Sequence, residues 1–172
     1  SPTLLVQDFV RSDFEARSYV VNGRIAHTVY STFGDQDEGG YPVCFLEKPR
    51  AAAVSEWLDG DDKAMESAEK KIGKVVGHWC AWLRARCPEG VPAIRIDCLV
   101  RRTGPGKAEV HTLELTELGF SMLSWARGPP IVFGALMESC FDDTGASAEE
   151  AEKMRAFTEA RTRRYERAPV KQ

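Results

Sequence analysis

The sequence predicts an α+β domain in which an antiparallel sheet carries its helices on one face. Three observations predict this fold: a β-hairpin signal at Asn22-Gly23, a helical apolar period over residues 61–86, and a second pair of strands within residues 93–119. Antiparallel sheets commonly pack one face on a core and keep the other polar. We therefore expect the chemistry of the molecule on the face that the helices leave open.

The composition is that of one globular domain, with 172 residues, 43% hydrophobic and 28% charged. A formal charge of -3 argues against a nucleic-acid partner held by broad electrostatics. No apolar run reaches the ~18 residues of a membrane span and no secretory signal is recognisable, so we expect a cytoplasmic protein with no membrane partner. The five cysteines are scattered without a Cys-x-x-Cys pair, which predicts reduced and mostly buried thiols.

The first strands follow from local patterns. Residues 4–10 form an apolar strand-like run, which leads us to expect a fragment of a larger fold. Asn22-Gly23 suits a two-residue type I′ turn, because both positions need positive φ. Regular pairing from this turn predicts a core face and a polar face for the hairpin. The predicted core face carries Ala16, Val20, Ile25 and Val29, and the predicted polar face carries Glu15, Arg17, Tyr19, Thr28 and Tyr30.

A glycine-rich acidic loop at residues 34–40 precedes a short predicted strand at 43–46. Lys48 and Arg50 follow and are candidates for phosphate contact, although exposed basic residues are common. Apolar residues then recur at helical spacing to residue 86, with Asp61 or Asp62 as the N-cap. We interpret Trp79 and Trp82 as core residues of this helix rather than as a stacking platform.

The strand pair at residues 93–119 carries the candidate chemistry. Ile94, Ile96, Cys98 and Val100 alternate with polar residues, so Asp97 falls on the polar side of its strand. In the next strand, strict alternation groups Val110, Thr112, Glu114 and Thr116 on one side. If the strands pair, Asp97 and Glu114 face the same site and suit a hard divalent cation such as Mg²⁺. The alternative is a pair of solvated carboxylates on an exposed sheet face.

After residue 119, the sequence predicts two short helices within residues 120–125 and 131–141, separated by a break at Pro129-Pro130. Ser147 and Glu150 form a capping box for a last helix at about 148–167. We divide the chain into a lobe at residues 1–141 and a terminal amphipathic helix at 142–172.

Four segments in this order resemble the carboxyl-terminal half of the ATP-grasp superfamily. They are Leu5-Val6-Gln7-Asp8-Phe9-Val10, Glu15-Ala16-Arg17, Arg95-Ile96-Asp97-Cys98 and Leu113-Glu114-Leu115-Thr116-Glu117. The resemblance implies an adenine-contacting hinge, a phosphate-binding strand and two strands with metal carboxylates. Thr116 stands where the superfamily usually has asparagine, and the superfamily's upstream half has no counterpart here. The Glu-Ala-Arg hairpin and Ser124-Trp125 also resemble an assembly-factor branch of the superfamily.

This resemblance assigns the candidate site residues. It implies ATP contacts from Gln7, Asp8, Phe9, Val10 and Arg17, a catalytic role for Arg17, and Mg²⁺ ligands from Asp97, Glu114 and Thr116. Lys48 is a further candidate for ATP contact. The alternative for Arg17 is a charge pair with Glu15 or a solvated guanidinium. It implies an ATP-dependent ligase that activates a small-molecule carboxylate as an acyl phosphate for attack by an amine or thiol. Two alternatives remain open: a non-catalytic ATP-binding assembly or chaperone module with a protein partner, and an interaction domain without a ligand.

Overall fold

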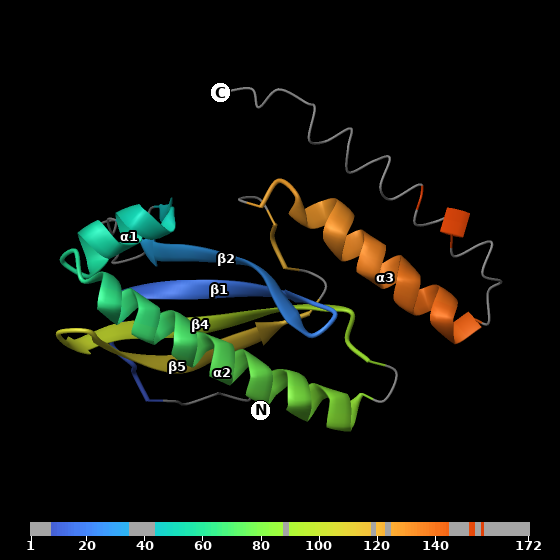
Figure 1. The fold of residues 1–172 in the computed structure, drawn as a ribbon, viewed down its shortest axis with the longest axis horizontal. Coiled ribbons are helices and arrows are strands. Elements are labelled where there is room, and N and C mark those ends of the chain that lie inside the picture. Colours follow the sequence, from blue (N-terminus) through green and yellow to red (C-terminus); the bar gives the residue numbers. More distant parts are fainter. Residues whose placement is uncertain are drawn as a thin grey trace, which may run out of the picture.

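The structure, a computed structural model, describes residues 8–34, 44–87, 90–117, 120–122 and 125–144, together with 152, 153 and 156. The described elements are, in order, β1 (Phe14–Val21), β2 (Arg24–Phe33), β3 (Phe45–Lys48), α1 (Arg50–Trp57), α2 (Asp62–Arg86), β4 (Ala93–Gly104), β5 (Lys107–Thr116) and α3 (Gly128–Thr144). The strands form one antiparallel sheet in the order β3-β2-β1-β4-β5 (Figure 1). The predicted α+β class with an antiparallel sheet is confirmed.

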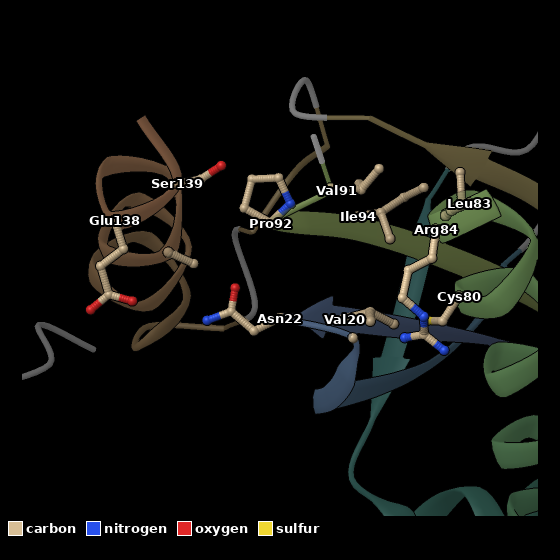
Figure 2. Close-up of a pocket in the computed structure, with 13 residues that line it drawn as sticks. Val20, Asn22, Cys80, Leu83, Arg84, Val91, Pro92, Ile94, Glu138 and Ser139 are labelled. Carbon is tan, nitrogen blue, oxygen red and sulfur yellow. The ribbon is translucent and has the colours of Figure 1, made fainter. Parts of the chain in front are cut away.

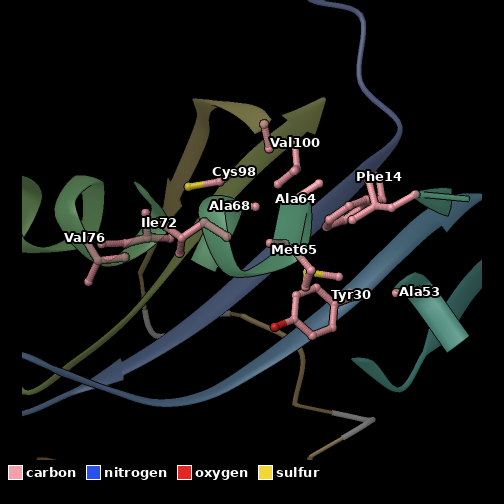
Figure 3. Packing of buried hydrophobic residues seen from close by; sticks show 14 of the residues in the cluster. Phe14, Tyr30, Ala53, Ala64, Met65, Ala68, Ile72, Val76, Cys98 and Val100 are labelled. Atoms are coloured by element: carbon pink, nitrogen blue, oxygen red, sulfur yellow. The ribbon is translucent and has the colours of Figure 1, made fainter. Parts of the chain in front are cut away.

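Helix α2 covers the apolar face of the sheet because its apolar residues repeat every three or four positions. Met65, Ala68, Ile72 and Val76 are buried against Phe14 and Ala16 of β1 and against the alternating apolar residues of β4 (Figure 3). The β4 residues are Ile94, Ile96, Cys98 and Val100. The helix begins as predicted, since the Asp61 side chain accepts a hydrogen bond from the Ala64 amide at 3.0 Å. The predicted packing of the sheet against a long helix is therefore confirmed.

The β1–β2 hairpin has the predicted turn but not the predicted register. Asn22 and Gly23 have φ of 49° and 74°, as a type I′ turn requires. A bulge between Tyr19 and Val20 then shifts the pairing, so that Tyr19 faces His27 and Ala16 faces Tyr30. The predicted faces of Thr28, Val29 and Tyr30 were wrong for this reason. Tyr30 joins the core with Ala16, Thr28 pairs with Ser18 on the same side, and Val29 lies on the opposite face.

A second bulge changes the alternation of β5. Thr112 pairs with Cys98 and Glu114 pairs with Asp97, so Leu113 is the extra residue between them. The prediction that Thr112 and Glu114 share one side was therefore wrong. The bulge has a direct consequence for the site, because it turns Glu114 to the face of Asp97.

The helices outside α2 differ from the sequence-based expectations. Helix α1 was not predicted, since its eight residues carry little apolar periodicity. Of the two short helices expected around Pro129-Pro130, the second, at residues 131–141, lies within α3 and is confirmed. The first is wrong over its described residues, since residues 120–122 are not helical. The predicted break is also wrong, because both prolines lie in the first turn of α3, where their missing amide is not needed. Figure 1 places α1 and α3 toward opposite ends of the sheet.

Helix α3 contacts one end of the sheet face that α2 does not cover. Val132 of α3 is buried in a cluster with Phe120 and Trp125, which packs on Tyr19 and Val29. Tyr19 alternates with the core residues Ser18 and Val20 and so points away from α2. The helices are therefore not all on one side, and this end of the polar face is covered.

Three further predictions concern cysteines, membranes and the terminal helix. All five cysteines are free thiols, but only Cys80 and Cys98 are buried, so the expectation of mostly buried thiols was wrong. Among the described helices, none combines the length and apolarity that crossing a membrane requires. Most of residues 142–172 lies outside the described residues, as does the loop at 35–43. Of the last helix predicted at about 148–167, only residues 152, 153 and 156 are described, and they are helical.

Candidate functional site

Six polar residues gather on the face of the sheet opposite α2, and we call this set the charged face. Its members come from three adjacent strands: Glu15, Arg17, Arg95, Asp97, Glu114 and Thr116. Strand pairing places Arg17 beside Asp97 and Asp97 beside Glu114, in one row across β1, β4 and β5. The next row sets Tyr19 beside Arg95 and Arg95 beside Thr116. A rigid sheet therefore holds three carboxylates and two arginines on one face.

Arg95 is the centre of the contacts on this face. Its Nε donates to both carboxylate oxygens of Asp97, at 2.8 and 3.0 Å. Its Nη2 donates to Asp97 Oδ2 at 2.6 Å, to Glu114 Oε1 at 2.9 Å and to Thr116 Oγ1 at 3.4 Å. Thr116 in turn donates to Glu114 Oε1 at 3.1 Å. One guanidinium thus holds together the three side chains that the sequence proposes as metal ligands.

The two carboxylates differ in environment. The Asp97 side chain is 0% exposed, whereas that of Glu114 is 53% exposed. Burial raises the pKa of Asp97 to about 6, although its bonds to Arg95 lower it, and its hydrogen bond with Glu114 adds to the rise. The same hydrogen bond lowers the pKa of Glu114. The pKa of Asp97 therefore lies above that of Glu114.

Arg17 belongs to the charged face but is held by another acid. Its Nε donates to Glu15 Oε1 at 3.1 Å, and its guanidinium carbon lies 4.2 Å from the centre of the Phe45 ring. Strand pairing nevertheless keeps Arg17 directly opposite Asp97. A ligand anion at this position would compete with Glu15 for the guanidinium, which is suited to bidentate recognition of phosphate.

The other predicted ATP-binding residues that the structure describes are not members of the charged face. Lys48 pairs with Tyr30, a core residue, and donates to Glu56 of α1 at 2.5 Å, so it lies on the helix-bearing side. Asp8 and Phe9 are exposed, Val10 is half-buried and none of them lies in a strand, contrary to the strand expected at residues 4–10. Gln7 lies outside the described residues.

A pocket of about 400 Å³ lies elsewhere, between the end of α2, α3 and the β1–β2 turn. Figure 2 shows Val20, Ile94 and Leu83 on its walls, with Arg84 and Asn22 as polar neighbours. No residue of the charged face lines this pocket. The charged face and the pocket are therefore separate features.

Arg95 is a member of the site that was not predicted from the sequence. A signal existed: Arg95 and Asp97 are two positions apart in one strand and so share a face. A buried carboxylate requires a partner, and an arginine at this spacing is the nearest candidate. The bulge at Leu113 had no comparable signal, because the strand reads as regular alternation.

The charged face offers oxygen donors for the cation that the sequence implies. Among the described residues, no group of three or more His, Cys, Asp or Glu side chains could hold a metal ion. Two carboxylates and a hydroxyl do converge on one positively charged atom, Arg95 Nη2. Oxygen donors of this kind suit Mg²⁺, which is often bound by one or two carboxylates and completed by water or phosphate oxygen. The residues therefore fit Mg²⁺, provided that Arg95 moves.

Comparisons of the chain with protein-family models, curated proteins and solved structures find no match.

Proposed function

We propose that the charged face is an Mg²⁺-dependent ATP site of the ligase type, which activates a carboxylate for attack by an amine or thiol. The observation that carries this proposal is the convergence of Asp97, Glu114 and Thr116 on a single cationic atom, with Arg17 in register beside Asp97. The order of strands that resembles the ATP-grasp superfamily supports it. When bound, Mg²⁺ would supply positive charge to the β- and γ-phosphates of ATP.

The side chains of the chain have separate roles in this proposal. Asp97 and Glu114 hold the cation, and Thr116 contributes its hydroxyl directly or through water. Arg17 exchanges Glu15 for the oxygens of the transferred phosphoryl group and stabilises their charge. A substrate carboxylate oxygen then bonds to the γ-phosphorus as ADP leaves. The amine or thiol next bonds to the acyl carbon, loses its proton and displaces inorganic phosphate.

Isothermal titration of the protein with ATP, in the presence and absence of Mg²⁺, tests the proposal. We expect Mg²⁺-dependent binding that is lost in Asp97→Asn and weakened in Glu114→Gln. The matched control is Glu109→Gln, which removes a charge from an exposed position of the same strand β5 and is expected to bind like wild type. Binding that is indifferent to Mg²⁺, or equal in Asp97→Asn and wild type, would refute the metal role.

A second function is favoured by one specific observation. Both arginines of the charged face are already paired with acids, Arg17 with Glu15 and Arg95 with Asp97. This arrangement also suits a module that binds ATP without turnover and uses it to recognise a protein partner. Measurement of ADP release with candidate carboxylates and amines separates the two: steady ADP release supports the ligase, whereas Mg²⁺-dependent ATP binding without ADP release supports the module.

A further inference from the structure

Arg95 lies where a cation would have to lie. Its Nη2 is 2.6 Å from Asp97 Oδ2, 2.9 Å from Glu114 Oε1 and 3.4 Å from Thr116 Oγ1. A magnesium ion needs oxygen ligands at about 2.1 Å. An ion bound to the same oxygens would overlap this nitrogen and would meet a like charge. The guanidinium and the cation therefore exclude each other.

We propose that Arg95 is a tethered cation that closes the site until a divalent cation enters together with a polyphosphate. This inference rests on the proposed function, because it concerns the same carboxylates. In the closed state, Arg95 covers both oxygens of Asp97 and one oxygen of Glu114. Opening requires Nη2 to leave Glu114 and Thr116 and to give up at least one bond to Asp97.

The net charge of the site leads us to expect weak binding of a divalent cation in the absence of an anion. With its acids ionised, the charged face holds three carboxylates, from Glu15, Asp97 and Glu114, and two guanidinium groups, from Arg17 and Arg95. One negative charge remains, which a divalent cation would convert to one positive charge. An anionic ligand that arrives with the cation removes this excess and gives Arg95 a new partner. Cation and polyphosphate are therefore expected to bind cooperatively.

The surroundings of Arg95 limit how far its guanidinium group can move. The residue is fixed on β4, between Tyr19 of β1 and Thr116 of β5, and its side chain is only 7% exposed. Tyr19 is itself held, because its hydroxyl donates to the Ser121 carbonyl at 2.8 Å and its ring packs against Trp125. The released guanidinium thus stays on the charged face, close to the anion that accompanies the cation.

Binding of Mn²⁺, a paramagnetic substitute for Mg²⁺, tests this inference on the full chain. The variant Arg95→Met removes the tethered cation, and Arg101→Met is the control, since Arg101 is exposed on the same strand. We expect wild type and Arg101→Met to bind Mn²⁺ alone weakly, and ATP to tighten their Mn²⁺ binding at least about tenfold. Arg95→Met should bind Mn²⁺ alone at least about tenfold more tightly than wild type, with a smaller gain from ATP. Equal affinity of Arg95→Met and wild type for Mn²⁺ alone would overturn the inference.

A measurement on wild type covers the case in which Arg95→Met fails to fold. The arginine Nε–Hε resonance of Arg95, assigned by comparison with Arg95→Lys, reports its bonds to Asp97. We expect it to shift with Mg²⁺ and ATP together and to remain unchanged with Mg²⁺ alone. An unchanged resonance at saturating Mg²⁺ and ATP would contradict the inference. Failure of ATP to bind wild type at all would instead refute the proposed function, whereas tight Mn²⁺ binding by Arg95→Met would still support the tethered cation.

Discussion

Replacing the Arg95–Asp97 pair by apolar residues provides the sharpest test of why this pair is present. The Arg95 side chain is 7% exposed and that of Asp97 is 0% exposed, so removing either partner leaves a charge in a buried site. Removing one partner of a buried ion pair typically lowers the free energy of unfolding by about 3–5 kcal/mol. The double replacement Arg95→Met/Asp97→Leu removes both charges and fills their space with apolar atoms. It should bring stability back to within about 1 kcal/mol of wild type.

The surrounding contacts make the two single variants unequal. In Asp97→Leu, Arg95 keeps a bond to Glu114 at 2.9 Å, and Glu114 is half exposed. In Arg95→Met, Asp97 loses the only guanidinium bonded to it among the described residues. Arg95→Met is therefore the more damaging change at pH 8. The loss of stability in Arg95→Met should be smaller at pH 5, because Asp97 can then take up a proton and remain buried without a charge.

Urea unfolding of wild type, both single variants and the double variant gives the coupling energy of the pair. We expect a coupling of at least about 3 kcal/mol at pH 8, since the double variant recovers what the single variants lose. Additive single effects, with a coupling near zero, would refute the reasoning. A stable double variant that no longer binds Mg²⁺ and ATP would indicate that the pair is retained for the site rather than for the fold.

Three further predictions follow from the packing, the pH dependence and the strand register. Ile96→Ala should cost about 2–5 kcal/mol by urea unfolding because Ile96 is fully buried, whereas Ile25→Ala, at an exposed position, should cost less than about 1 kcal/mol. Folding raises the pKa of Asp97 from 3.8 to about 6, so between these pH values the folded state binds more protons than the unfolded state. The free energy of unfolding of wild type should therefore fall by at most about 3 kcal/mol, relative to Asp97→Asn, as the pH rises from 4 to 6. A rise in this relative free energy would contradict the raised pKa of Asp97. Deletion of Leu113, the 42% exposed extra residue of β5, should leave Glu114 opposite Asp97 and preserve Mg²⁺-dependent ATP binding, which titration of the deletion variant would check.

The sequence predicted the elements that are set by local chemistry. Asn and Gly tolerate the positive φ of a type I′ turn, so the turn at Asn22-Gly23 could be recognised without the structure. Helix α2 could also be recognised, because apolar residues at helical spacing indicate a face packed on a core. The bulges between Tyr19 and Val20 and at Leu113 could not be recognised from the sequence, because an inserted residue leaves the apolar pattern of the segments on either side intact. These inserted residues determine on which side of the sheet the side chains of Val29, Tyr30 and Glu114 lie.

The candidate site was predictable only in part for the same reason. Asp97 could be placed on the polar face by alternation within its own strand. Glu114 reached that face only through the bulge, which strict alternation does not include. The contact of Arg95 with Asp97 could have been predicted from their spacing within β4. Its contact with Glu114 depends on the pairing of β4 with β5, which no local pattern encodes.

The central claim is that Asp97 and Glu114 hold a divalent cation together with ATP, and paramagnetic broadening by Mn²⁺ tests it most directly. In an isotope-labelled sample with ATP present, Mn²⁺ at low stoichiometry should selectively broaden the amide signals around Asp97 and Glu114. Signals near the separate pocket, such as those of Leu83 and Arg84, should broaden less. Broadening centred on that pocket, or no selective broadening in β4 and β5, would contradict the account.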